Sequence, residues 1–500
     1  MTATRTPAPL AAPAWERLVP RVALVLLVLG ALAGALSFTT YPNYDSMMAL
    51  VWGRDVLDGT LPAFDAYRAP TQHPLLILLG VVFAPLGGAA EPLMVGFGIG
   101  GYVALVLGVY RLGRVTIGVL GGLVAGVLVA SRLNLALLAS IAFLDIPYCA
   151  LIIWAAALEV ERPRRGGVVW ALLALAGLLR PEAWALAGLY AVWVGWSLPW
   201  RGRARAVALA AIAPVLWSLV DLIVTGNPVF SLTYTDGSAA DLQRERPLTS
   251  LPWLMVRLLA EILKWPVVGM AVAGVVLAIV LRRRQFAVPA VLVVVTCAEY
   301  LVIASGGLAT VYRYLLVAAL ALAVFAAFSL TGWTTIARGR ARTAWTVVAV
   351  AGIVLGAAYT VTHTNPAKVR VELRDRERIR ANLTALLRDP AVAAARRCGP
   401  LTVQNHKLVP EVRWILDLPD GAVIARSDRS QQVQTRGVTI LIDRRIERRP
   451  ALNIFEVPRD RDLRIELPPA GFRPIAGNRD FAAWARCDGD PPLVRVARPG

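Results

Sequence analysis

Charged residues are scarce in this chain of 500 residues: 17% are Asp, Glu, Lys or Arg, while 57% are hydrophobic. Soluble globular proteins average about 25% charged and about 45–50% apolar residues, so the composition excludes an ordinary soluble protein. The apolar content also excludes a disordered chain, and four cysteines over this length exclude a small disulfide-held scaffold. We therefore expect an integral membrane protein.

Lysine is nearly absent: three of the 52 basic residues are lysine and the others are arginine. The formal net charge is +19. No basic stretch is interleaved with aromatic residues, so a nucleic-acid partner is not expected. The positions of the arginines are informative, because cytoplasmic loops collect Arg and Lys near the ends of membrane spans.

Eleven apolar runs are candidate membrane helices, although several are shorter than the roughly 20 residues of a perpendicular span. They lie at residues 22–40, 93–110, 115–131, 147–160, 167–180, 183–199, 206–224, 266–281, 286–304, 311–330 and 344–361. A further apolar segment, 74–85, is interpreted as a juxtamembrane or re-entrant helix, because a twelfth crossing would move the later arginine clusters outside. The first run is longer than the apolar core of a signal peptide, which favours a retained span.

The arginine clusters fall on one face if the N-terminus is cytoplasmic. These clusters are Arg5 with Arg17 and Arg21, Arg111 with Arg114, the ERPRR run ending at Arg165, RGRAR from Arg201, the triplet Arg282 to Arg284, and RGRAR from Arg338. We therefore expect a multi-pass protein of the bacterial plasma (inner) membrane, with an extracytoplasmic C-terminal region.

The composition changes at the C-terminal end, which predicts a transmembrane domain at 1–362 and a small α/β domain at 363–500. Within the latter, 369–397 has a charged helical pattern, LTVQN, GAVIARS and GVTILID are predicted strands, and VPEVRWILDL is a predicted helix between the first two. Cys398 and Cys487 bracket most of this region. They could form a disulfide in an oxidising compartment or remain two unpaired thiols.

The external loops hold the residues from which chemistry is expected. The loop from Tyr41 to Leu76 contains Asp45 close to the first span, followed by Arg68 and His73. A second external loop, 225–249, precedes an amphipathic stretch with Trp253, Arg257, Glu261 and Lys264, which is expected to lie along the membrane surface. That loop could close over a donor, select an acceptor or merely connect two spans.

Several short motifs occur in an order that resembles the GT-C superfamily of membrane glycosyltransferases, especially its protein-mannosyltransferase-like and lipid A aminoarabinose-transferase-like branches. The motifs are NYDS with Asp45, the proline-led TQHPLLILLG, the arginine-marked turn YRLGR, FLDIP with Asp145, LAGLLRPEAW with Arg180, and GGLATVYRYL with Arg313. The protein-mannosyltransferase branch commonly has an Asp-Glu pair where this chain has Asp45 followed by Ser46, so the acceptor stays open.

The resemblance implies a GT-C-like fold of about 11 transmembrane helices and a polyprenyl-phosphate-linked sugar donor. Transfer from a lipid phosphate needs a base for the acceptor hydroxyl and cations for the leaving phosphate. Asp45 is the candidate general base and Asp145 a second catalytic carboxylate. Arginine suits phosphate because its planar fork donates two hydrogen bonds, so Arg180 and Arg313 are the main candidate phosphate ligands.

Arg68 and His73 are weaker candidate phosphate ligands. Asp45 and Asp145 could also help to hold a divalent metal, but two carboxylates do not identify one, because such sites need several oxygen ligands. The metal and any further cofactor are therefore unknown.

Each candidate has a structural alternative. Asp45 and Asp145 could cap helices, Arg180 could simply pair with Glu182, and Arg313 could be an interfacial anchor. His73 could be a structural histidine at a helix start.

The predicted function is transfer of a sugar from a polyprenyl-phosphate donor to an extracytoplasmic glycan, lipid or protein in the cell envelope, in contact with membrane lipids. A single inverting displacement is expected. The alternatives are a flippase or transporter of lipid-linked saccharides, which would place ionisable residues near the bilayer midplane, and a non-catalytic envelope assembly protein.

Overall fold

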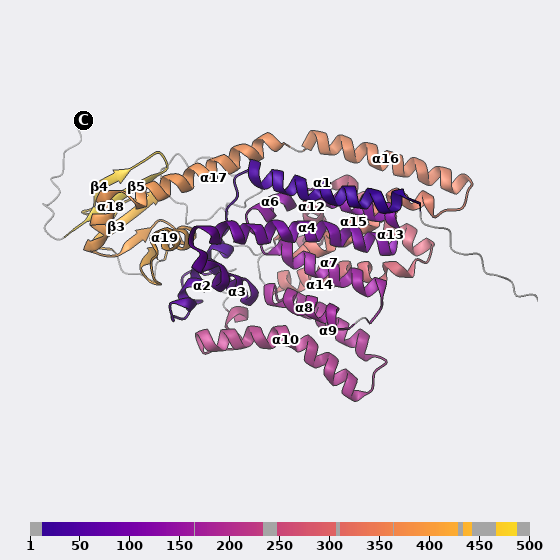
Figure 1. Cartoon of the computed structure of the whole chain (residues 1–500), viewed down its shortest axis with the longest axis horizontal. Coiled ribbons are helices and arrows are strands. Elements are labelled where there is room, and N and C mark those ends of the chain that lie inside the picture. Colours follow the sequence, from indigo (N-terminus) through magenta and orange to yellow (C-terminus); the bar gives the residue numbers. More distant parts are fainter. Residues whose placement is uncertain are drawn as a thin grey trace, which may run out of the picture.

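The computed structural model describes residues 13–164, 166–233, 248–306, 311–363, 365–428, 434–442 and 467–487. These form an elongated molecule with a helical part and a smaller sheet-containing part at one end (Figure 1). Most of the predicted external loop 225–249 and residues 307–310 of the GGLATVYRYL motif lie outside the described residues.

Each of the eleven apolar runs coincides with a helix. The helices are α1 (Trp15–Ser37), α4 (Ala90–Thr116), α5 (Val119–Ala130), α7 (Asp145–Glu161), α8 (Gly167–Leu179), α9 (Ala183–Gly195), α10 (Trp200–Thr225), α13 (Trp265–Val280), α14 (Ala287–Ser305), α15 (Leu316–Thr331) and α16 (Arg340–His363). Further helices in this part are α2 (Tyr44–Leu57), α3 (Pro74–Phe83), α6 (Leu133–Ser140) and α12 (Leu251–Leu263).

Not all of these helices are long and apolar enough to qualify as membrane spans by themselves. Within the described ranges, six helical segments are long and apolar enough to cross a membrane, or up to eight if each of two bent pairs is one span. Helices α8 and α9 have 13 residues each and so extend only about 20 Å, less than the hydrocarbon core of about 30 Å. A polytopic helical fold is therefore shown, whereas the count of eleven spans is not confirmed.

The segment predicted as a re-entrant or juxtamembrane helix forms α3. A short 3₁₀ turn, η1 (Ala84–Ala89), joins α3 to α4, and Gly87 breaks the helix with a φ of 56°. Helix α3 packs closely on α2, because a Cβ on Gly80 would collide with the backbone of Ala49. The segment that follows α1 thus folds into a compact helical pair.

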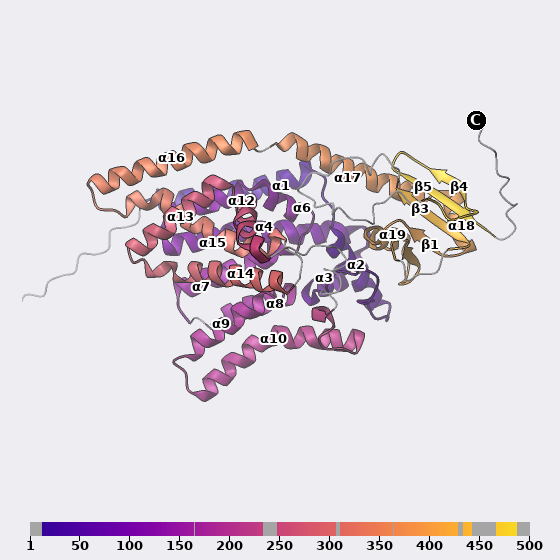
Figure 2. The ribbon, with the colours of Figure 1, turned by 180° about the vertical axis from the view of Figure 1, so that it is seen from behind.

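Helix α15 forms the centre of the helical part. Its sequence alternates alanine with larger apolar residues, and nearly all of its side chains are buried. Small residues let helices approach closely, and Gly274 of α13 lies directly against the Phe325 carbonyl. By contrast, α1 has no buried residue and α16 has one, Ala349. These two helices lie along the outside of the bundle in both views (Figures 1 and 2).

The C-terminal part is an α/β unit, as predicted. Its elements are α17 (Pro366–Leu387), α18 (Pro390–Ala395), β1 (Leu401–Val403), α19 (Val409–Leu416), β2 (Val423–Ala425), β3 (Gly437–Ile442), β4 (Arg473–Gly477) and β5 (Phe481–Arg486). The sheet order is β2-β1-β3-β5-β4; β1 is parallel to β2 and β3, and β5 is antiparallel to β3 and β4. The three predicted strands and the helix between the first two are confirmed.

The sheet packs against α17 and α18 around a core of Leu387, Val403, Ile440 and Ala483. Cys398 and Cys487 form a disulfide with a Cα–Cα distance of 5.2 Å, so of the two alternatives left open by the sequence the structure has the bonded one. The bond joins the turn before β1 to the end of β5 across 89 residues.

Replacing Cys398 by Ser should destabilise the C-terminal part by about 2–4 kcal/mol, because the unfolded chain is no longer closed into a long loop. Thermal unfolding measured with and without reductant tests this. Reductant should lower the wild-type transition to that of the variant. The control Cys297→Ser, which removes a free thiol in α14, should keep the full sensitivity to reductant.

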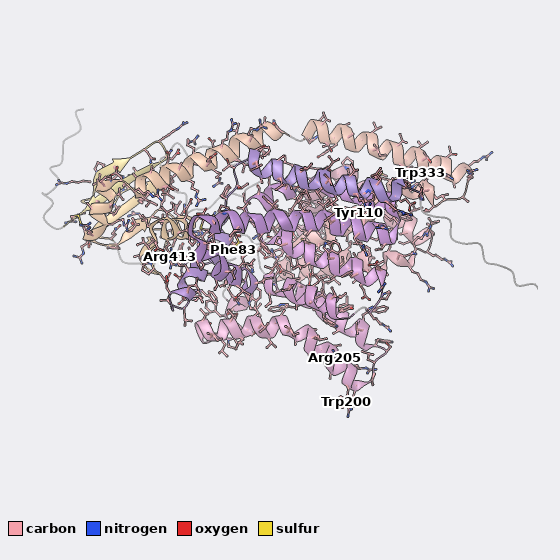
Figure 3. All side chains as sticks on the ribbon, in the orientation of Figure 1. Phe83, Tyr110, Trp200, Arg205, Trp333 and Arg413 are labelled. Carbon is pink, nitrogen blue, oxygen red and sulfur yellow. A yellow bond between two sulfur atoms is a disulfide. The ribbon has the colours of Figure 1, made fainter. Side chains whose placement is uncertain are left out.

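The C-terminal part docks on α2 through one buried ion pair and a more exposed one beside it. Arg413 of α19 donates from Nη2 to both Asp55 carboxylate oxygens at 2.9 and 3.0 Å, and the two side chains are 2% and 4% exposed. Beside them, Arg54 donates to Asp417 at 2.6 Å and to the Leu418 carbonyl at 2.8 Å. Burial raises the pKa of Asp55, although Arg413 acts in the opposite direction. Figure 3 places Arg413 at the junction of the two parts.

Aromatic contacts extend this junction towards the loop between α2 and α3. The buried His406 ring meets Tyr44 edge-on, with centroids 5.6 Å apart, and Tyr67 in the same way at 6.1 Å. Tyr67 also donates to the Ser427 carbonyl at 2.9 Å. Because Tyr44 precedes Asp45 in α2, the C-terminal part contacts the segment that presents the candidate base.

Candidate active site

Asp145 lies at the centre of a group of charged side chains. It begins α7 and is 1% exposed. Its two carboxylate oxygens bind different arginines: Oδ1 pairs with Arg180, and Oδ2 lies 3.5 Å from Nη1 of Arg313. No side-chain cap is formed at the start of α7, so Asp145 pairs with two arginines and does not cap the helix.

Arg313 connects Asp145 to Asp45. It lies in the 3₁₀ turn η4 (Tyr312–Leu315), and its Nη1 is 3.9 Å from Oδ2 of Asp45. The side chains of Arg313 and Asp45 are 27% and 21% exposed, so this longer contact lies at the accessible side of the group. Arg313 also lies over the Phe143 ring at 5.0 Å, which fixes it beside the start of α7.

Asp45 is not the cap of its helix. Asn43 is the N-cap of α2, and its side chain accepts a hydrogen bond from the Ser46 backbone N–H at 3.0 Å. The Ser46 hydroxyl donates to the Ala142 carbonyl at 2.5 Å and thereby ties α2 to the turn before Asp145. The capping alternative for Asp45 is therefore wrong, and its carboxylate faces Arg313 instead.

Arg180 is shared by two carboxylates. It follows α8 in an extended conformation and pairs with Glu182 at 2.5 Å as well as with Asp145. Its guanidinium lies 5.2 Å from the Tyr314 ring and 5.8 Å from the Tyr148 ring. The pair of Arg180 with Glu182, which was the structural alternative, is thus present. Arg180 also contacts Asp145 and the two tyrosine rings.

His73 lies in the same region, at the N-cap position of α3. Burial lowers its pKa to about 3, with further lowering by the positive charge of Arg180. The ring meets Trp217 of α10 edge-on at 5.9 Å. His73 is thus a neutral imidazole, which can offer a hydrogen bond to a ligand but no positive charge.

Arg68 lies in the loop between α2 and α3. Its backbone has a φ of 54°, and its carbonyl accepts a hydrogen bond from the Tyr44 hydroxyl at 3.1 Å. Its guanidinium lies over the Tyr67 ring at 5.3 Å. These contacts place Arg68 beside the tyrosines at the junction with the C-terminal part.

The structure therefore brings Asp45, Asp145, Arg180 and Arg313 into one group of ion pairs, with His73 coupled to it electrostatically. These residues come from five segments spread over 269 positions of the chain, from 45 to 313. Across the described part of the chain, no group of three or more His, Cys, Asp or Glu residues is arranged to hold a metal ion.

Several residues that surround this group were not predicted from the sequence. Glu299 of α14 is electrostatically coupled to Arg180 and Glu182, and Tyr148 and Tyr314 flank Arg180. A carboxylate inside an apolar helix is rare and usually functional, so Glu299 in the TCAEYL stretch could have been predicted from the sequence as a candidate site residue. Tyr148 and Tyr314 could not have been predicted in this way, because aromatic residues are common near the ends of membrane helices.

Comparisons with known proteins give no match to a family model or to a curated protein sequence. Solved structures do match. ArnT from Cupriavidus metallidurans bound to undecaprenyl phosphate has 15% identity and a TM-score of 0.57, over 93% of this chain and 98% of that chain. The same ArnT in the apo state has 14% identity and a TM-score of 0.53 with the same coverage.

A third similar structure is the Archaeoglobus fulgidus oligosaccharyltransferase tethered with an acceptor peptide. It has 12% identity and a TM-score of 0.49, over 83% of this chain and 64% of that chain. At such identities the likeness is one of fold. The chain therefore has a fold similar to that of ArnT, in agreement with the fold that the order of its motifs led us to expect.

Proposed function

We propose that this chain is a membrane glycosyltransferase that moves a sugar from a polyprenyl-phosphate donor to an extracytoplasmic acceptor. Its fold is that of ArnT, which has been solved with undecaprenyl phosphate bound, and this likeness supports a lipid-phosphate donor. We further propose the bacterial plasma membrane as its location, with the N-terminus in the cytoplasm. In support, Arg205 lies away from the C-terminal part, as expected for a cytoplasmic arginine cluster (Figure 3).

The main observation behind this proposal is that Arg313 contacts two carboxylates. It joins Asp45, which is partly accessible, to the buried Asp145, which also holds Arg180. A base and two cations are thus assembled from separate external segments. Both carboxylate oxygens of Asp145 pair with arginines, so we assign it as a positioning residue for Arg180 and Arg313.

The proposed step is a single displacement. The acceptor hydroxyl oxygen attacks the anomeric carbon of the donor and forms the new C–O bond, while Asp45 accepts the hydroxyl proton. The C–O bond to the lipid phosphate breaks, and its electron pair leaves with the phosphate. Arg313 and Arg180 stabilise the growing negative charge, because guanidinium groups can donate paired hydrogen bonds to phosphate oxygens.

The accessible end of Arg313 fits this order of events. Its contact with Asp45 is 3.9 Å long and partly exposed, so an arriving phosphate could take over this guanidinium. Loss of this contact with Arg313 would make Asp45 a better base for the acceptor. An inverted configuration at the anomeric carbon follows from one displacement.

A panel of radiolabelled polyprenyl-phosphate sugars, supplied to membranes that contain the chain and a native acceptor extract, tests the proposal. We expect at least one donor to label the acceptor fraction in proportion to the amount of the chain. Movement of labelled lipid across the vesicle membrane without any transfer would overturn the proposal in favour of a flippase. Transfer that is equal in membranes lacking the chain would favour a non-catalytic assembly protein.

A further inference from the structure

Helix α12 departs from the direction of the bundle. It meets α13 at a bend of 108°, and Lys264 occupies the bend. One face of α12 is buried through Leu258, Leu259 and Ile262, and the helix packs against η4, which carries Arg313, and against α15. The other face exposes Trp253, whose side chain is 64% accessible. Such an amphipathic helix suits the surface of a membrane.

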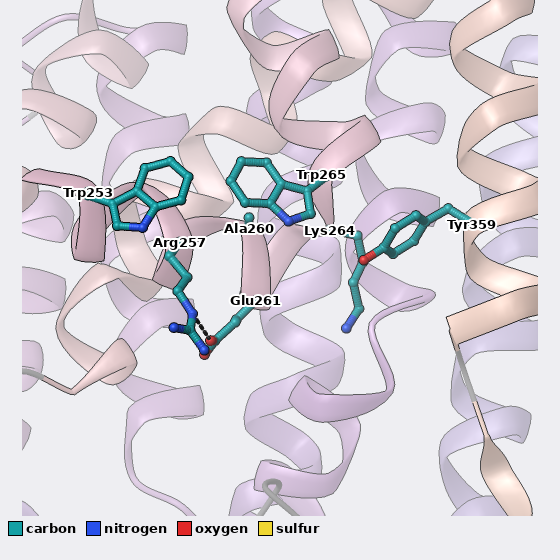
Figure 4. A pocket seen from close by; sticks show the side chains of 7 residues that line it. All are labelled: Trp253, Arg257, Ala260, Glu261, Lys264, Trp265 and Tyr359. Carbon is teal, nitrogen blue, oxygen red and sulfur yellow. Dashed lines mark ion pairs between the residues drawn. The ribbon is translucent and has the colours of Figure 1, made fainter.

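A pocket of about 410 Å³ lies on the exposed side of this bend. Figure 4 shows the side chains that line it: Trp253, Arg257, Ala260, Glu261, Lys264 and Trp265 from α12 and its junction with α13, and Tyr359 from α16. Helices α13 and α16 pack together at Met270 and Gly352, so the pocket lies between α12 and this pair.

Positive charge dominates the lining. Arg257 and Lys264 are cations, and Glu261 is the one carboxylate among the seven lining residues. Glu261 pairs with Arg257 at 3.3 Å, but both side chains are more than half exposed, so the pair is weak and leaves the guanidinium available. The buried Arg132 adds a third positive charge near the bend by donating to the Leu263 carbonyl at 2.9 Å.

Lys264 has an unusual backbone conformation. Its φ of 76° and ψ of 145° lie in a region that glycine adopts readily and other residues avoid. A glycine at this bend would relieve the strain, yet the chain has a lysine that lines the pocket. Residues held in such conformations cluster at ligand sites, which favours a role for the ammonium group.

The aromatic residues indicate the kind of ligand. Trp253 and Trp265 stack with centroids 6.1 Å apart, and Tyr359 stacks on His363 at the end of α16. Tryptophan and tyrosine favour the boundary between lipid headgroups and hydrocarbon. Below the pocket, α13 and α16 expose apolar side chains such as Val272 and Ile353, which could receive a hydrocarbon chain.

We propose that this pocket binds the phosphate headgroup of an anionic phospholipid from the outer leaflet of the membrane. Arg257 and Lys264 contact the phosphate, the aromatic residues lie at headgroup depth, and the acyl chains follow the exposed faces of α13 and α16. This site is separate from the Asp45 group and does not depend on the glycosyltransferase proposal. Because α12 packs against η4, a bound lipid would also brace the turn that carries Arg313.

Native mass spectrometry of the purified full chain tests this site with four probes: phosphatidylglycerol, phosphatidylcholine, a polyprenyl phosphate and inorganic phosphate. We expect phosphatidylglycerol to bind more tightly than the other three. Arg257→Gln and Lys264→Gly should each raise its Kd about fivefold, the effect expected of one basic residue near an anionic membrane surface. Glu261→Gln should lower the Kd, because it removes the competing carboxylate.

One of these variants also tests whether weaker lipid binding could come from misfolding. Lys264→Gly relieves the backbone strain, so it should melt no lower than the wild type while it binds the lipid more weakly. Arg388→Gln, an exposed arginine between α17 and α18, is the matched control and should not change the Kd. Equal binding of phosphatidylglycerol and phosphatidylcholine, tighter binding of polyprenyl phosphate or inorganic phosphate, or an unchanged Kd in Glu261→Gln would each overturn the proposal.

Discussion

Asp45→Asn is expected to lower the turnover rate about 10²- to 10⁴-fold, because the amide keeps the shape of the side chain but cannot accept the acceptor proton. The variant should still fold, since the N-cap of α2 is supplied by Asn43 and the link to Ala142 by Ser46. Sugar transfer per mole of purified protein, measured at saturating donor, reads out the effect.

The matched control is Asp58→Asn, an exposed carboxylate at the other end of the same helix. It should transfer sugar at the wild-type rate. If Asp45→Asn retained the wild-type rate with intact folding, Asp45 would not be the base, and the role of the accessible carboxylate in this site would have to be abandoned.

Arg413→Met is expected to destabilise the docking of the C-terminal part by about 3–5 kcal/mol, because it leaves the buried Asp55 carboxylate without its partner. Burial already raises the pKa of Asp55, and loss of Arg413 should raise it further, since Arg413 is the main influence that lowers it. Release of the C-terminal part by limited proteolysis and the melting temperature should both report the loss.

A second substitution separates charge from packing. Asp55→Asn combined with Arg413→Met removes both charges and should recover much of the lost stability, because replacing a whole buried ion pair is often nearly neutral. The exposed Arg388→Ala is the control and should behave as the wild type. Proteolysis of Arg413→Met at the wild-type rate would show that this ion pair does not hold the two parts together.

The positions of the helices could be predicted because apolar runs are a strong local signal. All eleven runs coincide with helices, but run length alone did not decide which of them cross a membrane. The short α8 and α9 and the bent pair of α5 and α6 show why: bends and breaks depend on packing between helices, which a single sequence does not display.

The C-terminal sheet was predicted in part. Strands β1, β2 and β3 are rich in β-branched residues, whereas β5 has the sequence FAAWAR and β4 contains a proline. Alanine and proline are depleted in strands, so β4 and β5 carried no local signal. Strand β5 forms by pairing with β3, which is a contact between residues distant in the sequence, and β4 then pairs with β5.

The candidate site could be predicted as a set of residues but not as a geometry. Loop position and residue type selected Asp45, Asp145, Arg180 and Arg313, which the structure brings together. The division between the buried Asp145 and the accessible Asp45 emerged only from their exposure in the fold. The neutral state of His73 likewise depends on burial and on the nearby Arg180, which no local pattern encodes.

The most direct test of the proposed displacement is an assay with purified protein that follows both of its products. Wild-type protein, a doubly labelled polyprenyl-phosphate sugar and the acceptor identified from the donor panel are mixed, and released lipid phosphate and glycosylated acceptor are quantified together. A single displacement predicts equal amounts of the two products, with inverted configuration at the anomeric carbon. Retained configuration, or lipid phosphate released without glycosylated acceptor, would contradict it.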